Sequence, residues 1–393
     1  MPHHRPHVPG FLISYFRDRE LNELYLSIAL KTLAQSLIVI FVPIYFITLG
    51  YTLFDISFFY LIYFITVGLV VPIGMVLNSK IGIKKTLALG TFILIFYYYL
   101  LGFLDQGFSY KLIALVAGVS SAIYFAAFHI DFAKAANKGT EGKELSMLRI
   151  IIIIVGVLGP VTGSLLISNF SFNIIFKIVS GILFLSIMPL FYTKDIKAPY
   201  KGFSLKKIIK ADTRGKAMAY NASSIIGIVG MYFWPLFIYL TLKSVVSLGV
   251  IISLSSLITI FIIAYIGRLT DRDKNNVFKL GVMLYAPSWL MRIFLLTPMG
   301  IFFVNFYATI TGSLIDLPFY KMVYAKAKRS KNMANYFLFR EYNLMTGRIF
   351  ILGLSMITVS VFTLSMIQNI IILFIITFFS VFLYLAVLKN KWR

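Results

Sequence analysis

The sequence has no cysteine among its 393 residues and only 14 aspartate and glutamate residues. The absence of cysteine excludes disulfide bonds and thiolate metal sites. Charged residues make up 13% of the chain and hydrophobic residues 60%, whereas soluble domains are about 25% charged and about 45–50% apolar. So large an apolar share cannot be hidden inside a water-soluble particle of this size. The composition excludes soluble enzymes, secreted disulfide-rich proteins and disordered chains, and predicts an integral membrane protein.

The apolar residues gather into long stretches, most of them close to the roughly 20 residues that cross a bilayer as a helix. The predicted fold class is therefore an all-α integral membrane protein with twelve transmembrane helices. These helices are expected at residues 24–48, 56–77, 86–103, 110–132, 147–168, 173–193, 217–241, 247–266, 277–296, 300–324, 336–363 and 367–388.

The 37 lysine and arginine residues give the chain a formal net charge of +23. In a soluble protein this excess would indicate nucleic-acid binding. Here, however, most basic residues lie in the N-terminal segment, in every second connection between the predicted helices and in the C-terminal tail. The positive-inside rule therefore predicts a multi-pass protein of the cell membrane, with both termini in the cytoplasm and no nucleic-acid partner.

The longest basic connection lies near the middle of the chain and divides the predicted helices six and six. We expect a cytoplasmic N-terminal lead-in, a first six-helix half, a basic cytoplasmic linker, a second six-helix half and a cytoplasmic tail. These parts correspond to residues 1–23, 24–193, 194–216, 217–388 and 389–393.

Several local features recur 192 positions apart in the two halves. Residues 41–43, Phe-Val-Pro, match residues 233–235, Phe-Trp-Pro, and residues 132–135, Phe-Ala-Lys-Ala, match residues 324–327, Tyr-Ala-Lys-Ala. Each pair lies at an equivalent place in its half. The offset predicts a parallel repeat, in which the halves are related by an axis along the membrane normal.

Residues 267–272, Gly-Arg-Leu-Thr-Asp-Arg, follow the eighth predicted helix. They resemble the signature G-x-x-x-D-[RK]-x-G-x-[RK]-[RK] of the major facilitator superfamily, and Gly267, Asp271 and Arg272 occupy matching positions. A weaker first-half copy at residues 79–85 keeps Lys80, Gly82 and Lys84, but has Ser79 in place of the acid. The motif predicts a tight turn whose aspartate caps a helix N-terminus and pairs with arginine.

The resemblance covers essentially the whole chain. It implies two six-helix halves around a central site, a small-molecule substrate, alternating access across the lipid bilayer and a functional monomer without a cofactor. Residues 156–164 also resemble the G-P-x-x-G-G element associated with antiporters of this superfamily, carried here by Gly159, Pro160 and Gly163. Ordinary close packing beside a proline kink is the alternative interpretation.

Acidic groups inside the membrane are expensive and therefore candidates for proton coupling. Asp316 lies about 13 Å from the cytoplasmic end of its predicted helix at 1.5 Å per residue, and is the first candidate. Glu341, His129 and Asp131 lie closer to the boundary and are further candidates. A structural salt bridge is the alternative for Asp316 and Glu341, and a solvated or loop-pairing role is the alternative for His129 and Asp131.

A second set of polar and aromatic residues is predicted to line the substrate path. Arg348 is the most deeply placed cation of its helix, and either binds an anionic substrate group or holds Asp316. The other candidates are Gln35, Asn221, Trp234, Asn305 and Arg340.

Two features of the first half are expected to have no role in transport. Lys31 is expected to extend its side chain toward the lipid headgroups. The run of three tyrosines at residues 97–99 is expected to face lipid or the interfacial belt.

The sequence thus predicts a secondary transporter, proton-coupled and more consistent with an efflux antiporter. Uptake symport, lipid or lysolipid movement, and a receptor or scaffold that kept the fold remain alternatives. No nucleotide-binding loop, catalytic triad or metal cluster has credible spacing, so neither an enzyme nor a metal site is predicted. The composition, rich in isoleucine, lysine and phenylalanine, is typical of AT-rich prokaryotic genomes.

Overall fold

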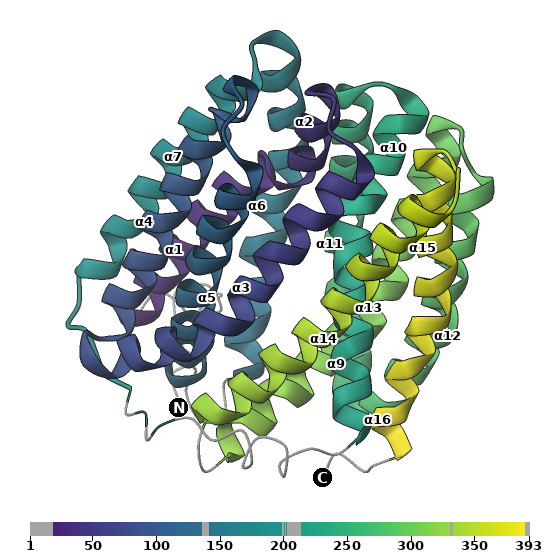
Figure 1. Cartoon of the computed structure of the whole chain (residues 1–393). Coiled ribbons are helices and arrows are strands. Elements are labelled where there is room, and N and C mark those ends of the chain that lie inside the picture. The colour runs from purple at the N-terminus through teal and green to yellow at the C-terminus, as the bar shows by residue number, and fades with distance from the viewer. Residues whose placement is uncertain are drawn as a thin grey trace, which may run out of the picture.

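The computed structural model describes residues 19–135, 141–198, 200, 202, 214–330 and 333–389, and these residues contain helices but no strand (Figure 1). The first-half helices are α1 (Arg19–Ser36), α2 (Val42–Thr48), α3 (Leu53–Lys80), α4 (Ile83–Leu101), α5 (Tyr110–Ala135), α6 (Glu141–Asn169) and α7 (Phe172–Ile187). The second-half helices are α9 (Arg214–Ile228), α10 (Trp234–Leu242), α11 (Val245–Arg272), α12 (Lys274–Phe294), α13 (Pro298–Arg329), α14 (Met333–Val361), α15 (Met366–Val381) and α16 (Ala386–Lys389).

The described residues hold ten helices that are long and apolar enough to cross a membrane. Two shorter apolar segments, Ile154–Asn169 and Val245–Ile258, lie in α6 and α11, which run for 29 and 28 residues. The predicted all-helical membrane fold is confirmed. The first helix begins at Arg19, inside the stretch expected to be a lead-in.

The first and seventh crossings are both interrupted, at positions 192 residues apart. The first changes from α1 through the short 3₁₀ helix η2 (Val39–Phe41) to α2, which has Pro43 in its first turn. The seventh changes from α9 through the π-helical segment η5 (Val229–Phe233) to α10, which has Pro235 in its first turn. Proline has no N–H to donate, so the helical ladder is broken at each site.

The helices form two groups that contact each other along two seams. Within the first group α3 and α4 pack on α5, and within the second α11 and α12 pack on α13. The seams are α6 against α11 and α3 against α14. We call the end of the bundle where α1 begins and α16 ends the proximal end, and the other the distal end (Figure 1).

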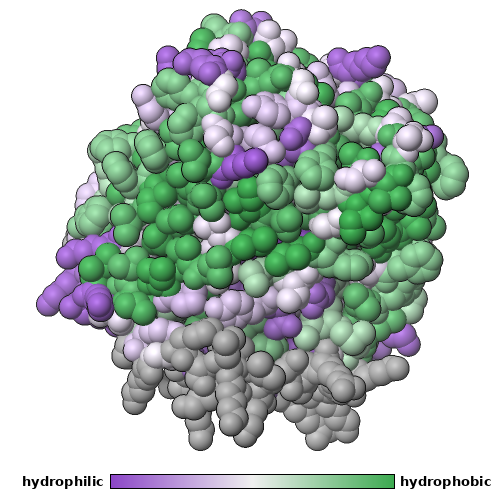
Figure 2. Space-filling view, in the orientation of Figure 1, coloured by the Kyte–Doolittle hydropathy of each residue, from purple (hydrophilic) through white to green (hydrophobic). Residues whose placement is uncertain are grey.

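The molecular surface fits a membrane environment. Apolar side chains form a broad band around the middle of the visible face, and hydrophilic ones gather toward its ends (Figure 2). Large apolar residues such as Leu69, Phe92 and Phe379 are more than half exposed. A surface of this kind is stable only against lipid.

The turn between α3 and α4, the weaker motif copy, is held by an acid from elsewhere in the chain. Asp195 accepts hydrogen bonds from the backbone N–H groups of Lys84 (2.9 Å) and Lys85 (3.1 Å) at the start of α4. Gly82 has a φ of +109° and leaves no room for a Cβ beside that carboxylate. Asp195 therefore supplies the capping carboxylate that Ser79 does not.

Lys84 lies inside the bundle, unlike the exposed Lys80. Its Nζ lies 2.7 Å from a carboxylate oxygen of Glu23 in α1, and also contacts the hydroxyl of Thr193. Both members of the ion pair are buried. The motif lysine thus ties α4 to α1 within the first half.

Candidate substrate cavity and gate

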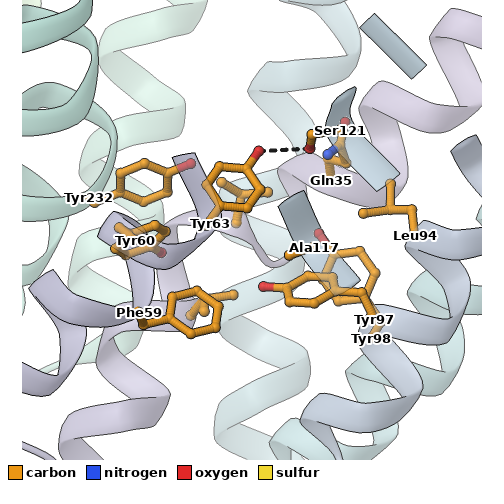
Figure 3. Close-up of a pocket in the computed structure, with 12 residues that line it drawn as sticks. Gln35, Phe59, Tyr60, Tyr63, Leu94, Tyr97, Tyr98, Ala117, Ser121 and Tyr232 are labelled. Atoms are coloured by element: carbon orange, nitrogen blue, oxygen red, sulfur yellow. Dashed lines mark hydrogen bonds between the residues drawn. The ribbon is translucent and has the colours of Figure 1, made fainter. Parts of the chain in front are cut away.

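A cavity of about 60 Å³ lies among the first four crossings and is closed on one side by the seventh. It is lined by Gln35, Val39, Val42, Phe59, Tyr60, Tyr63, Leu94, Tyr97, Tyr98, Ala117, Ser121 and Tyr232. In Figure 3, Phe59, Tyr60, Tyr63 and Tyr232 face Gln35, Leu94, Tyr97 and Tyr98 across it. This volume has room for a few water molecules but not for a whole metabolite, so a solute would fit only if the walls moved apart.

The walls combine flat aromatic rings with hydroxyl groups. Tyr60 and Tyr232, from opposite halves, stack with ring centroids 3.9 Å apart. The hydroxyls of Tyr63 and Ser121 lie 2.7 Å apart in a hydrogen bond (Figure 3). Stacked rings with hydroxyl edges suit a ligand that is itself flat and carries hydrogen-bonding groups.

Gln35, predicted to line the substrate path, lies in this wall. Lys31, one helical turn earlier, donates from Nζ to Gln35 Oε1 at 2.6 Å and lies 3.9 Å from the Tyr124 ring centroid. Lys31 is buried, so the expectation that it extends to the headgroups is wrong. An ammonium only donates, so it fixes the amide oxygen toward itself and leaves the amide NH₂ for other partners.

The expectation for the tyrosine run is wrong in part. Tyr97 and Tyr98 are buried and line the cavity, whereas Tyr99 is 58% exposed. Three consecutive helical residues cover most of a turn, so they cannot all face lipid. A count of flat hydroxylated side chains in the second and third crossings would have pointed to the cavity.

A charged cluster on α14 lies next to the cavity. Glu341 is buried and accepts from Arg340 Nη1 at 2.6 Å, and its other carboxylate oxygen lies 3.7 Å from Arg348 Nη1. The Arg348 guanidinium lies 4.5 Å from the ring centroid of Phe64. The charge of Arg348 reaches the hydroxyls of both Tyr63 and Tyr232. The structure thus joins predicted proton-coupling and substrate-binding residues in one cluster.

His129 on α5 connects this cluster to the other half. Its Nε2 accepts from Arg340 Nη1 at 3.0 Å, and its Nδ1 lies 3.1 Å from the hydroxyl of Tyr324 on α13. Acceptance at Nε2 assigns a neutral imidazole with the proton on Nδ1. The ring also stacks on Phe337 at 5.0 Å. His129 is therefore a bridge between halves, and Asp131, two residues later, is buried too.

Asp316 lies in the middle part of α13 but is exposed and does not line the cavity. Its charge acts on the hydroxyls of Tyr285 and Tyr384. Arg348, one of its expected partners, pairs with Glu341 instead. The structure therefore brings Glu341, and not Asp316, next to the cavity.

Three other predicted path residues lie outside the cavity wall. Trp234 donates from its indole N–H to Asn305 at 3.0 Å, and both are buried within the second half. Asn221 accepts from the hydroxyl of Thr346 on α14 at 2.9 Å. These contacts hold second-half helices to one another.

The antiporter-like element of α6 is a junction of three helices. A Cβ on Gly159 would overlap Ser36, and one on Gly163 would overlap the backbone carbonyl of Leu37, both at the end of α1. On the other side Gly249 of α11 packs against Pro160, with no room for a Cβ. The backbone N–H of Val161 donates to Ser253 Oγ of α11 at 3.1 Å. Small residues here allow two helices to approach α6 at once.

The second motif copy ends α11. Gly267 has open space around it, and Arg272 is exposed in the last turn. The side chain of Asp271 lies outside the described part of the structure. The expected latch of this copy stays a prediction.

Polar contacts join the two halves toward both ends of the bundle. The hydroxyls of Ser57 in the first turns of α3 and Ser355 in the last turns of α14 lie 2.8 Å apart at the distal side. His129, Tyr324 and Arg340 meet on the proximal side. Two groups of helices joined along two seams, with a small cavity lined by residues of both groups, are typical of membrane transporters.

The comparisons identify the family. The model of the Major Facilitator Superfamily matches residues 24–339, so the chain belongs to that family. The crystal structure of the nucleoside transporter NupG superposes with a TM-score of 0.68 at 14% identity, covering 95% of this chain and 100% of that one. The crystal structure of a mutant form of NupG superposes with a TM-score of 0.71 at 15% identity over the same shares. No curated protein matches the sequence.

Proposed function

We propose that this protein is a proton-coupled secondary transporter of a flat, uncharged, hydrogen-bonding solute, with nucleosides as the first class to test. The observation that carries the proposal is the cavity of stacked tyrosines with Gln35 in its wall. Flat heterocycles stack on aromatic side chains with useful affinity, and the ring edges hydrogen-bond to amides and hydroxyls. NupG, which shares the fold, is a nucleoside transporter.

Glu341 is the proposed proton carrier. Its carboxylate balances Arg340 and Arg348, and Arg340 holds His129 of the other half. A proton on Glu341 removes the negative charge and leaves two cations beside the bridge, which weakens the proximal closure. Proton uptake and the opening of the halves are thereby linked through one cluster.

The direction of transport is proposed from α6. The partial antiporter element favours exchange of a proton for an outgoing solute, and uptake symport is the alternative. Efflux and uptake use the same cavity and the same proton carrier. They differ only in whether the proton gradient drives the solute out of the cell or into it.

The test is transport of tritiated uridine by the purified protein in proteoliposomes, with and without an imposed pH gradient. We expect gradient-driven accumulation, and Glu341→Gln should reduce it by about tenfold or more while uridine exchange without a gradient persists. Asp316→Asn tests the proton carrier that the sequence predicts. Tyr99→Phe, at an exposed position, is the control. The sign of the gradient that drives accumulation in vesicles of known orientation gives the direction.

Each part of the proposal has its own failing outcome. If uridine, adenosine and their free bases neither bind nor exchange while another solute does, the substrate class is wrong. If accumulation is unchanged by the gradient, proton coupling is wrong. If Asp316→Asn loses coupling and Glu341→Gln keeps it, the carrier is Asp316.

A further inference from the structure

Arg292 of α12 is a buried cation clamped between two tryptophans of the second half. It is 3% exposed, and its guanidinium carbon lies 3.7 Å from the Trp289 ring centroid and 4.6 Å from that of Trp234. Cation–π contacts of this kind compensate part of the cost of burying a charge. The proposed transport mechanism makes no use of this residue.

The polar atoms of this cluster that lack partners are all donors. Among the described residues, Nε and Nη1 of Arg292 are buried without a hydrogen-bond partner, whereas the hydroxyl of Tyr285 interacts with the guanidinium and with the Trp289 indole. No described carboxylate pairs with Arg292, and the hydroxyl of Tyr285 close to the guanidinium is uncharged. Arginine keeps its proton in proteins, so the positive charge stays without a carboxylate partner.

The repeat shows where this cluster lies in the architecture. Moving back by 192 positions takes Trp234 to Val42 and Trp289 to Tyr97, both of which line the first-half cavity. The cluster is therefore the second-half counterpart, by position in the repeat, of part of the first-half cavity wall.

We propose that this counterpart is a second binding site, which takes a small anion: an inorganic anion or the carboxylate group of a small solute. Two unpartnered donor nitrogens on a fixed positive charge suit a group that only accepts hydrogen bonds and is negatively charged. The site is independent of the uncharged solute proposed for the first half, and the two sites are separate by residue and by chemistry.

The two tryptophans make the site observable in the detergent-purified full-length protein. Trp234 and Trp289 report by fluorescence, and Trp392→Phe removes the remaining tryptophan of the chain. Sodium chloride or sodium acetate replaces the sodium salt of a bulky sulfonate buffer at constant ionic strength, and emission and thermal unfolding are followed. A saturable response to chloride alone indicates an inorganic anion, and one to acetate indicates a carboxylate group.

The expected result is a saturable emission change with a parallel rise in the unfolding temperature. Arg292→Gln should weaken the apparent affinity by about tenfold or more, Arg292→Lys should retain part of it, and Arg329→Gln, an exposed arginine, should behave as the parent. If the parent protein responds linearly to both anions, without saturation, the proposal is overturned and no variant is needed. Equal responses from Arg292→Gln and Arg329→Gln also overturn it. Because no transport is measured, failure here leaves the proposed function untouched.

Discussion

At the scale of the residue, buried charges in this protein fall into compensated and uncompensated groups. Lys84 has Glu23 as its carboxylate partner, and Arg340 and Arg348 share Glu341. Lys31 and Arg292 are as deeply buried, and no described carboxylate pairs with either. We expect the paired charges to stabilise the fold. The charges without a carboxylate partner lower the stability of the fold and are therefore candidates for functional residues.

Loss of Lys84 should destabilise the first half. Lys84→Met leaves Glu23 as an unpaired buried charge, which typically costs about 3–5 kcal/mol. The expected result is a lower unfolding temperature of the purified protein. Lys80→Met, an exposed lysine of the same motif, is the control and should be close to neutral; equal effects of the two would show that the pair contributes nothing.

Loss of Lys31 should affect solute binding rather than lower the stability of the fold. Lys31→Met removes a charge without a carboxylate partner and frees Gln35 to rotate, so we expect unchanged or higher thermal stability together with weaker solute binding. Uridine binding and thermal unfolding measured on the same samples check both parts. Lys111→Met, at an exposed position, should change neither, and unaltered affinity in Lys31→Met would remove Lys31 from the binding account.

The sequence alone predicts only some of these residue roles. Gln35 was found because a polar side chain in an apolar helix is conspicuous. Lys31, Tyr97 and Tyr98 were misplaced because depth and facing depend on which neighbouring helix covers them. Glu341 was ranked below Asp316 on depth alone, whereas partners from α14 and the other half decide which acid lies beside the cavity.

At the scale of the element, α6 carries the most demanding packing. Its glycines touch α1, and Pro160 touches Gly249 of α11. The sequence predicted an unusual element there, because glycine and proline together stand out in an apolar helix. It could not show that the element joins three helices, since that depends on how the halves meet.

The effect of a glycine-to-alanine substitution in α6 on stability should depend on its position. Gly163→Ala places a methyl group against the Leu37 carbonyl, and overpacking of this kind costs about 1–3 kcal/mol. Gly156→Ala, about two turns earlier in open space, should be neutral or slightly stabilising. Thermal unfolding and uridine exchange of both variants check the prediction, which fails if the two alanines have equal effects.

At the scale of the whole molecule, the all-helical membrane fold could be predicted because lipid imposes it. Every crossing needs a long apolar helix, and the charges between crossings follow from topology. The contacts between halves follow no such rule. Ser57 with Ser355 and His129 with Tyr324 pair residues 298 and 195 positions apart, and ordinary polar side chains give no signal of such partners.

The natural absence of cysteine allows a direct test of movement between the halves. In Ser57→Cys with Ser355→Cys, the introduced pair is the only one in the chain, and its oxidation should hold the distal side closed. We expect loss of uridine exchange on oxidation and recovery on reduction, whereas each single variant stays active in both conditions. Full exchange by the cross-linked protein would contradict alternating access at this seam.

The hydrogen bond between Val161 of α6 and Ser253 of α11 lies off-centre in both helices. From Val161 to the distal end of α6 there are about 12 Å of helix, and to the proximal end about 30 Å, at 1.5 Å per residue. A rotation of about 10° around this contact moves the distal end by about 2 Å and the proximal end by about 5 Å on that geometry. We therefore expect that rotation of the halves around this contact opens the distal side less than the proximal side.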